Sequence, residues 1–309
     1  MRKIKIGTRA SRLALWQAEF VATELKKFFS ELEIELVKVR TTGDKILDAP
    51  LAKIGGKGLF TKELELQMAA GAIDLAVHSL KDMPTELPKR FKIAAITKRA
   101  QPFDAFVSNH FPTFDALPKN SVVGTSSLRR AAQILSLRPD LQIKNLRGNV
   151  ETRLKKLDAG EFDAIILAAA GLERLGYSSR INELLTEIIP AAGQGALAIE
   201  TRADDEKIFF LVQKLNDAET CEAVKVERDF LAEVGGNCQI PVGVFAMIDN
   251  GQIKVRALIA SLNGQEIIKA SEVAPLENIC NLGKKIAAHL LENGGRKILD
   301  KLTGLTTAT

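Results

Sequence analysis

Over its first two-thirds, the chain alternates short apolar runs with longer segments whose apolar residues recur at helical spacing. The short runs are rich in β-branched residues and predict buried strands, whereas the longer segments predict amphipathic helices. The predicted strands are residues 3–7, 33–40, 73–78, 121–124 and 163–168. The predicted helices are residues 13–28, 61–70, 128–137 and 150–159. This alternation predicts an α/β fold with parallel sheets that are covered by helices on both faces.

Two pairs of short segments repeat one another along this part of the chain. Residues 6–11 (IGTRAS) follow a predicted strand and open a helix, as residues 123–127 (VGTSS) do, and residues 71–76 (GAIDLA) resemble residues 160–165 (GEFDAI). The repetition predicts two similar α/β domains. Ligands of open α/β sheets bind in the crevice at the carboxyl ends of the strands, so we expect an anion-binding turn there in each domain, with a cleft between the domains.

The last third of the chain has a different pattern. A predicted helix at 218–234 leads into a Gly-Gly-Asn-Cys turn, and the Asn-Gly pairs at 250–251 and 263–264 are typical of β-hairpins. A second helix is predicted at 277–293. These elements predict a small α+β domain at residues 217–309. The two α/β domains are expected at residues 1–98 with 196–216 and at residues 99–195, with hinges at 97–102 and 190–195, where proline and glycine interrupt the pattern.

Two turns in the middle of the chain combine arginines with hydroxyl side chains at helix openings. A helix N-terminus offers free N–H groups and a positive dipole end, and arginine grips a carboxylate or phosphate with two hydrogen bonds. The sequence therefore predicts a substrate with several negative charges. The residues concerned are Thr125, Ser126, Ser127, Arg129 and Arg130 in the first turn, and Arg147 and Arg153 in the second.

Composition narrows the choice of partner and compartment. The net charge is +5, but basic and acidic residues are interspersed, and Trp and Tyr occur once each, which argues against nucleic-acid binding. No apolar stretch is long enough to span a membrane, and the N-terminus lacks a secretory apolar region. The cysteines Cys221, Cys238 and Cys280 are an odd set without metal-ligand spacing, so we expect no metal site and a cytoplasmic protein with reduced thiols.

The cysteines differ in their surroundings. Cys221 and Cys280 are predicted to be buried packing residues, as lone cysteines usually are. Cys238 lies in a glycine-rich turn, where a thiol can be exposed and oriented. No histidine or asparagine partner for acyl transfer is evident, so covalent tethering is the more plausible role for Cys238.

Residues 77–84 (VHSLKDMP) place Lys81 and Asp82 at the carboxyl end of a buried strand. A carboxylate among cations at such a position could stabilise a developing positive charge. The alternative interpretation is a solvated turn that ends at Pro84. His78 is predicted to be a buried strand residue rather than a base.

Residues 41–60 form a glycine-rich stretch that carries Lys53 and Lys57. It is not a nucleotide-binding phosphate loop, because Gly58 follows Lys57 where Ser or Thr is needed. Two interpretations remain open, a lid over the cleft and a plain surface loop.

Together, these segments resemble the porphobilinogen deaminase (hydroxymethylbilane synthase) family over nearly the whole chain. The resemblance rests on several motifs in family order and spacing: residues 8–11 (TRAS), 13–18 (LALWQA), 55–60 (GGKGLF), 77–82 (VHSLKD), 124–130 (GTSSLRR), 146–153 (LRGNVETR), 193–196 (GQGA) and 238–241 (CQIP).

The resemblance implies two α/β domains similar to periplasmic binding proteins, which flank a cleft, and a smaller third domain. It also implies one covalent dipyrromethane cofactor, held by a thioether at Cys238, and Asp82 as the catalytic residue that contacts pyrrole N–H groups. Lys53, Lys57 and Phe60 would belong to the lid. The positions that match carboxylate-binding residues of the family are Arg9, Ser11, Lys81, Thr125, Ser126, Ser127, Arg129, Arg130, Arg147, Arg153 and Arg174.

The implied activity is that of a transferase in tetrapyrrole biosynthesis. Four porphobilinogen molecules condense head to tail onto the cofactor with loss of ammonia, and water then releases the linear tetrapyrrole. Each pyrrole brings an acetate and a propionate, which agrees with the many cationic positions. The expected protein is a cytoplasmic monomer whose partner is the small-molecule substrate, with no nucleic acid, membrane or metal.

Two other functions remain open from the residues alone. The same cleft could belong to a non-catalytic binding protein for an acidic metabolite. The basic surface could bind nucleic acid, although the scattered charges and few aromatic residues argue against that function.

Overall fold

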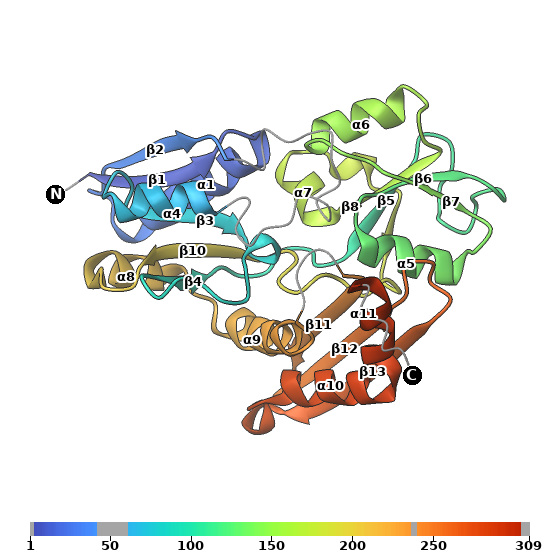
Figure 1. The fold of residues 1–309 in the computed structure, drawn as a ribbon. Helices are drawn as coiled ribbons and strands as arrows, with labels where there is room; N and C mark the ends of the chain where they lie inside the picture. The colour runs from blue at the N-terminus through green and yellow to red at the C-terminus, as the bar shows by residue number, and fades with distance from the viewer. Residues whose placement is uncertain (1–2, 42–60, 236–239, 304–309) are drawn as a thin grey trace.

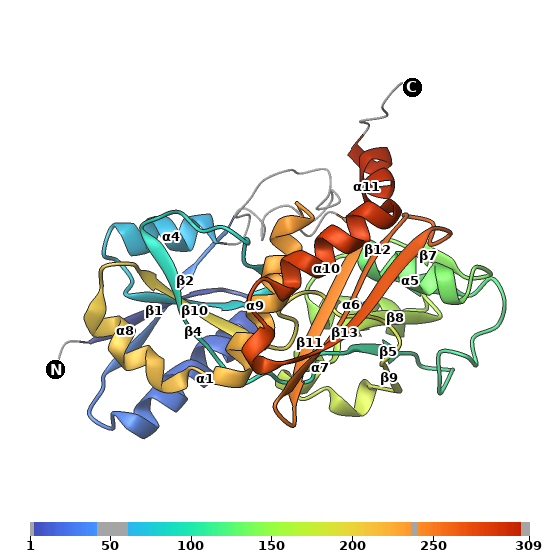
Figure 2. The ribbon, with the colours of Figure 1, turned by 90° about the horizontal axis from the view of Figure 1, so that it is seen from below.

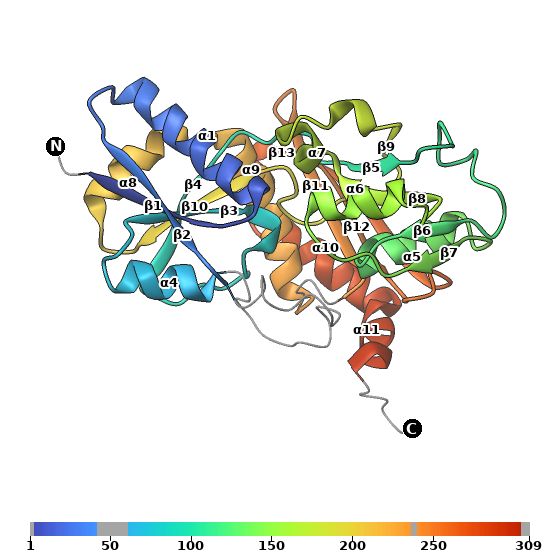
Figure 3. The same cartoon turned by 90° about the horizontal axis from the view of Figure 1, so that it is seen from above.

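The computed structural model describes residues 3–41, 61–235 and 240–303. Two α/β domains lie side by side, and a third domain packs beneath both (Figures 1 and 3). The predicted attachment residue Cys238 and the predicted lid residues Lys53, Lys57 and Phe60 lie outside the described residues.

The first domain is built on a five-stranded sheet of order β2-β1-β3-β10-β4. Helices α1 and α8 pack on one face through residues such as Val21 and Ile208, and α4 packs on the other through Leu64 and Met68. Both faces are therefore buried, which explains the near-continuous apolar strands. The elements are β1 (Ile4–Arg9), α1 (Arg12–Phe28), β2 (Ile34–Val39), α4 (Lys62–Ala69), β3 (Leu75–Ser79), β4 (Phe91–Ile96), β10 (Leu197–Arg202), α8 (Glu206–Val212) and the short turns η1 (Leu80–Asp82) and η3 (Gln213–Leu215).

The second domain repeats this plan with a sheet of order β7-β6-β8-β5-β9. Helix α5 covers one face through Ile134, and α6 and α7 cover the other through Leu154 and Leu172. The elements are β5 (Asp104–Val107), β6 (Val122–Gly124), α5 (Leu128–Leu137), β7 (Gln142–Lys144), α6 (Val150–Asp158), β8 (Ala164–Ala168), α7 (Ala169–Arg174), η2 (Ser178–Arg180) and β9 (Glu183–Leu185).

The predicted α/β class and every predicted strand and helix of these two domains are confirmed. The predicted parallel pairing holds for β1 with β2 and β3 and for β6 with β7 and β8, but each sheet is mixed rather than wholly parallel. β10 runs antiparallel to β3 and β4, and β5 runs antiparallel to β8 and β9. The reason is the path of the chain, which crosses from one sheet to the other between β4 and β5 and returns between β9 and β10. Each crossing delivers a strand that enters the new sheet in the opposite direction.

The third domain is an antiparallel sheet of order β11-β12-β13 packed against helices, as the α+β prediction requires. Asn250 and Gly251 both have positive φ, at 51° and 74°, and form the tight turn between β11 and β12 that their sequence predicts. The elements are α9 (Ala218–Glu233), β11 (Val242–Asp249), β12 (Gln252–Ala260), β13 (Ile267–Pro275), η4 (Leu276–Asn278), α10 (Leu282–Leu290), η5 (Leu291–Gly295) and α11 (Arg296–Thr303).

The predicted helix at 277–293 starts too early. Asn281 has a φ of 59°, which separates η4 from α10, so the regular helix begins only at Leu282. Gly294, with a φ of 108° inside η5, lies one residue beyond the predicted end.

One carboxylate in α9 joins the third domain to both crossings of the chain. Glu227 is fully buried and forms two hydrogen bonds of 2.7 and 2.8 Å with the guanidinium group of Arg99. It also accepts hydrogen bonds from the backbone N–H groups of Gly193 at 2.6 Å and Ala246 at 2.8 Å. Arg99 belongs to the first crossing and Gly193 to the second, so Glu227 holds both crossings against β11.

Candidate active site

A pocket of about 190 Å³ lies where the three domains meet, and we call it the central pocket. The first domain contributes the end of β3, the second contributes the openings of α5 and α6, and the third contributes apolar side chains beside β11. The lining residues are Lys81, Asp82, Ser126, Ser127, Arg129, Arg130, Arg153, Ala191, Ala192, Gln194, Leu231, Ile240, Val242 and Val244. Four predicted cations, two predicted hydroxyls and the predicted catalytic carboxylate are thus brought together.

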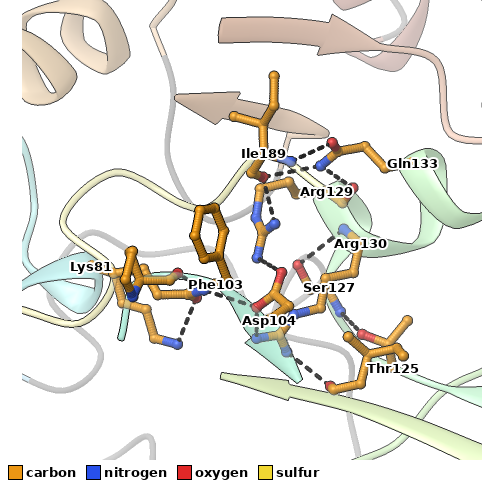
Figure 4. Close-up of polar contacts among 12 residues, drawn as sticks. Lys81, Phe103, Asp104, Thr125, Ser127, Arg129, Arg130, Gln133 and Ile189 are labelled. Carbon is orange, nitrogen blue, oxygen red and sulfur yellow. Dashed lines mark hydrogen bonds and ion pairs between the residues drawn. The ribbon is translucent and has the colours of Figure 1, made fainter. Parts of the chain in front are cut away.

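The turn between β6 and α5 is shaped by its small and hydroxyl side chains. A side chain on Gly124 would meet the ring of Phe162 at 2.7 Å, so the strand can end there only with glycine. The hydroxyl of Thr125 accepts a hydrogen bond from the Ser127 N–H at 3.2 Å, and Ser127 caps α5 by accepting from the Arg130 N–H. This turn therefore fixes the direction in which α5 starts (Figure 4).

Arg129 and Arg130, in the first turn of α5, share one buried carboxylate, Asp104 of β5. Their Nη2 atoms lie 2.8 and 2.7 Å from its two oxygens, and all three side chains are almost fully buried. Burial alone would raise the pKa of Asp104, but the two guanidinium groups outweigh burial and hold it far below its usual value. Asp104 therefore stays charged and fixes the orientation of both arginines (Figure 4).

Both arginines also donate hydrogen bonds to backbone carbonyls. Arg129 donates from Nη1 to the Ile189 carbonyl at 2.7 Å, and Arg130 donates from Nη1 to the Ile166 carbonyl at 3.1 Å. Gln133 fixes Ile189 in turn, because it accepts from the Ile189 N–H at 2.8 Å. Both guanidinium groups are therefore preorganised rather than mobile at the pocket wall.

A polar chain connects this pair to the first domain. The side-chain amide of Gln194 donates to Asp104 at 2.8 Å and to the Pro102 carbonyl at 2.7 Å. Its oxygen accepts from Nζ of Lys81 at 3.2 Å. Burial, together with nearby Arg130, lowers the pKa of Lys81 to about 8. Lys81 and the arginines thus form one electrostatic unit across the two domains.

Asp104 and Gln194 were not among the predicted site residues. Gln194 stood within a family motif, and Asp104 opens a four-residue buried run, where an acidic residue needs a cationic partner. The buried position of Asp104 could therefore have predicted a cationic partner, but nothing in the sequence identifies that partner.

Asp82 is exposed and lies in η1, directly after β3. Its neighbours Leu80 and Met83 are buried at 1% and 4% exposure, and the Leu80 N–H donates to the Ala196 carbonyl at 3.0 Å. The turn is anchored on both sides of Asp82, which explains why a solvent-accessible side chain has a defined place at the pocket.

Arg153 and Arg147 belong to the second arginine turn, and Arg153 lines the central pocket. Asn149 caps α6 by accepting from the Thr152 N–H, and Arg153 donates from Nε to the Gly148 carbonyl at 2.8 Å. Burial, with Arg130 and Arg147 nearby, lowers the pKa of Arg153 to about 10. Arg147 is half-buried and is not among the lining residues.

Four other predicted residues also lie outside the lining of the central pocket. Ser11 caps α1, Arg9 ends β1, and Thr125 is a buried part of the β6–α5 turn. Arg174 donates to the Gly195 carbonyl at 2.6 Å and lies over the ring of Trp16, and burial lowers its pKa to about 10.

The predictions for the other titratable residues had mixed outcomes. His78 is a buried strand residue, as predicted, and its Nε2 lies 3.0 Å from Glu200. The prediction that Cys221 and Cys280 are buried is wrong, because Cys221 is half-buried and Cys280 is exposed. Cys280 falls in the break between η4 and α10, and Cys221 faces a cavity beside α9.

The described part of the chain has neither a membrane-spanning helix nor a cluster of metal ligands. No helix there is both long enough and apolar enough to cross a bilayer. No three histidine, cysteine, aspartate or glutamate side chains in the same residues are grouped so that they could hold a metal ion.

Two family models match almost the whole chain. The model described as porphobilinogen deaminase, dipyromethane cofactor binding domain, matches residues 4–209, and the model described as porphobilinogen deaminase, C-terminal domain, matches residues 221–292. The first model extends over both α/β domains and the second over most of the third domain.

Among solved structures, the chain is similar to binding proteins of the periplasmic type. A nutrient-binding protein from Burkholderia cenocepacia bound to methionine is 16% identical, with 70% of this chain and 93% of that one covered and a TM-score of 0.45. A periplasmic substrate-binding protein of an ABC transporter from Coxiella burnetii is 13% identical, with 71% and 94% covered and a TM-score of 0.45. Similarity at this level carries no argument about function.

Proposed function

Because the chain belongs to the porphobilinogen deaminase family, which has a dipyrromethane cofactor, we propose that it condenses four porphobilinogen molecules head to tail on that group. Each condensation loses ammonia, and hydrolysis then releases hydroxymethylbilane. The protein is in this proposal a transferase of tetrapyrrole biosynthesis.

The observation that carries the proposal is the meeting of one exposed carboxylate with several cations in the central pocket. Asp82 comes from one α/β domain, and Arg129, Arg130 and Arg153 come from the other. A polyanion that bridges the domains would neutralise these cations, while a positive charge that develops on it would lie near Asp82. An acidic pyrrole whose reaction passes through a cation has both properties.

The residues of the pocket fit the family's cofactor. A dipyrromethane carries four carboxylates, and the donors that line the pocket are arginine, lysine and serine side chains, which bind carboxylates well. The buried Nε of Arg130 donates to no acceptor in the described part of the chain. The pocket wall therefore has cationic and hydrogen-bonding capacity that the described protein groups do not use.

The roles of the side chains follow from their positions. Asp82 accepts hydrogen bonds from pyrrole N–H groups and stabilises the positive charge that forms on the incoming substrate when its amine leaves. Arg129, Arg130 and Arg153 hold carboxylates, and Asp104 keeps the first two oriented. When bound, the dipyrromethane supplies a nucleophilic pyrrole carbon. Arg9, Ser11, Arg147 and Arg174 are proposed to extend the carboxylate-binding surface beyond the central pocket.

Cys238 is the proposed attachment residue, through a thioether. Ile240 lines the central pocket, and Cys238 precedes it by two positions in the sequence, which supports this assignment. A thiolate is also a strong nucleophile toward carbon. Lys53, Lys57 and Phe60 are proposed to act in a lid over the pocket.

The proposal also covers the assembly, the compartment and the domain boundaries. All three domains of a single chain contribute to the central pocket, which supports a functional monomer. Cys221 and Cys280 are free thiols, which supports the cytoplasm. The proposed boundaries stay those of the sequence patterns, near residues 98, 195 and 216.

Intact-mass measurement of the native protein tests the proposal. The expected mass exceeds that of the chain by two pyrrole units and rises in steps when porphobilinogen is added. Acidic p-dimethylaminobenzaldehyde should colour the protein pink. Cys238→Ala should lose the added mass, whereas Cys280→Ala, a matched control at an exposed cysteine, should keep it.

Either of two results would contradict the proposal. A native protein with the bare mass of its chain would favour a simple binding protein for an acidic metabolite. An adduct that persists in Cys238→Ala would exclude Cys238 as the attachment site.

A further inference from the structure

A second cavity, of about 390 Å³, lies between the first and third domains, and we call it the α9 cavity. One wall is β4 with α8 and η3 of the first domain, and the other wall is α9, which lies beside β4 in Figures 1 and 2. Among the described residues, it shares no lining residue with the central pocket. The lining residues are Thr85, Ile93, Ala94, Ala95, Ile96, Phe209, Gln213, Asn216, Cys221, Lys225, Arg228, Asp229 and Ala232.

The α9 cavity holds a cation without a carboxylate partner. Arg228 is half-buried, and its Nη2 donates to the carbonyls of Pro84 at 2.7 Å and Thr85 at 3.0 Å. No carboxylate oxygen of the described residues lies within 4 Å of its guanidinium nitrogens, although Asp229 also lines the cavity. The Nε and Nη1 atoms donate to no described group. Two nitrogens of a cavity-lining guanidinium group are therefore available to a ligand.

Removal from water makes an unpaired guanidinium group costly. Burial lowers the pKa of Arg228, which reflects that cost, and neighbouring Asp229 offsets it only in part. An anion in the cavity would restore the missing counter-charge and accept the remaining N–H groups.

Apart from Lys225 and Asp229, which carry opposite charges, the rest of the lining is mainly apolar or already hydrogen-bonded. Gln213 donates to the Ala94 carbonyl, and Asn216 accepts from the Ile96 N–H at 2.9 Å, so both amides are used to fix β4. Phe209 and residues 93–96 present hydrocarbon to the cavity. The volume falls within the range of about 300–1,000 Å³ that is usual for small-molecule sites, and such sites combine apolar walls with a few polar groups.

We propose that the α9 cavity is a binding site for a small organic monoanion, with its carboxylate-type group on Arg228 and its apolar body against β4 and Phe209. The site differs in chemistry from the central pocket. With Lys225 and Asp229 of opposite charge, Arg228 leaves a net charge of one positive unit within mostly apolar walls. Such a lining suits a single negative charge on a hydrocarbon body, whereas porphobilinogen carries two carboxylates and an ammonium group. The proposal does not depend on the function proposed above.

The α9 cavity adjoins the segment that positions Asp82. Pro84 and Thr85, which Arg228 binds, follow Asp82 closely in the chain. Ile96 and Cys221 of the cavity wall belong to the same apolar cluster as Leu80 and Met83, which anchor the turn of Asp82. A ligand on Arg228 therefore contacts the support of the Asp82 turn without entering the central pocket.

Cys221 provides a local readout, because it is a free, half-buried thiol on the cavity wall. The intact protein, in a Cys280→Ser background, is treated with monobromobimane, and mass spectrometry of the peptide that contains Cys221 gives the labelling rate. The probes are octanoate and octanamide, which have the same length but differ in charge.

Octanoate is expected to slow the labelling of Cys221 at about tenfold lower concentration than octanamide, the difference that a charge-assisted hydrogen bond commonly makes. Arg228→Met should abolish this difference, and Arg90→Met, at an exposed arginine outside the lining, should preserve it. Equal protection by the two probes, or no protection by octanoate at millimolar concentration, would overturn the proposal. Because that comparison is made in protein with native Arg228, it stands even if Arg228→Met fails to fold.

Discussion

The two α/β domains use the same backbone devices at the start of their sheets. Asp74 accepts from the Lys5 N–H at 2.9 Å and donates its own N–H to the Lys5 carbonyl at 2.8 Å. Asp163 does the same with Val122, at 2.6 and 2.9 Å. Each aspartate is the fourth residue of its repeated segment, so the short sequence repeat reflects a structural repeat.

The domains differ in the first residue of their antiparallel strands, β5 in the second domain and β10 in the first. In the second domain Asp104 begins β5 and lies opposite Ala168, the last residue of β8. In the first domain the equivalent position is Leu197, which begins β10 opposite Ser79, the last residue of β3. One domain therefore has a buried counter-ion for its arginines, and the other has an apolar residue there and an exposed carboxylate, Asp82, nearby.

In the second domain the buried carboxylate of Asp104 orients two arginines, whereas in the first domain the carboxylate of Asp82 stays exposed. In the proposed function the arginines bind the anionic ligand and Asp82 contacts it. Four predictions test the comparison, in order of decreasing expected effect.

Asp104→Ala should lower the free energy of unfolding by about 3–5 kcal/mol, because it leaves two buried guanidinium groups without a carboxylate. Denaturant titration measures the loss. Asp158→Ala is the matched control in the same domain. This variant removes a 2.7 Å ion pair between Asp158, whose carboxylate is 48% exposed, and Arg180. The free energy of unfolding should therefore fall by at most about 1 kcal/mol. Similar losses in both variants would mean that Asp104 is not a special counter-ion.

Asp82→Asn should lower kcat by about 10²–10³, the usual effect of removing one preorganised electrostatic group, with no loss of stability because Asp82 is exposed. Steady-state kinetics on protein of verified cofactor content measures the change. Glu86→Gln, at an exposed carboxylate on the same segment, should retain normal turnover. Near-normal kcat in Asp82→Asn would remove Asp82 from the mechanism.

Asp74→Ala and Asp163→Ala should each lower the free energy of unfolding by about 1–3 kcal/mol, because each leaves a backbone N–H without its acceptor. The loss should be larger at Asp74, which is 1% exposed and lies 3.6 Å from Arg202, than at half-buried Asp163. Thermal or chemical denaturation compares the two. If only one variant is destabilised, the two aspartates are not structurally equivalent.

Lys81 should make substrate binding sensitive to pH near 8. With a pKa of about 8 it is charged below that pH and neutral above it, so KM should rise by about twofold to fivefold between pH 7 and 9. Lys81→Arg, which stays charged, should flatten this limb of the profile. An unchanged profile in Lys81→Arg would assign the pH dependence to another group.

The lowered pKa of Lys81 also determines how the free energy of unfolding changes with pH. The pKa of Lys81 is lower in the folded protein than its ordinary value of 10.5, so between pH 8 and 10.5 the unfolded chain binds the extra proton. Stability should therefore rise with pH across that window as the buried charge is lost.

The local parts of the structure could be predicted from the sequence. Helix α5 has the predicted bounds, and the Asn250–Gly251 turn forms where its residue types require positive φ. The position of Arg129 and Arg130 in the first turn of α5, after a hydroxyl cap, was also predictable, because a cap acts within one turn of the chain. Predictions that needed knowledge of neighbours were weaker, as the wrong burial of Cys280 illustrates.

By itself, the sequence determined the strands and helices with a clear local pattern, such as β1, α1 and α5, and where the two arginine turns lie. These properties depend on residues a few positions apart. Only the tertiary structure decided that Asp104 neutralises Arg129 and Arg130, that β10 and β5 run antiparallel to their neighbours, and that Arg228 faces a cavity without a counter-ion. Burial and charge pairing depend on which distant segments pack together, and that is settled by the crossing of the chain between domains rather than by any local pattern.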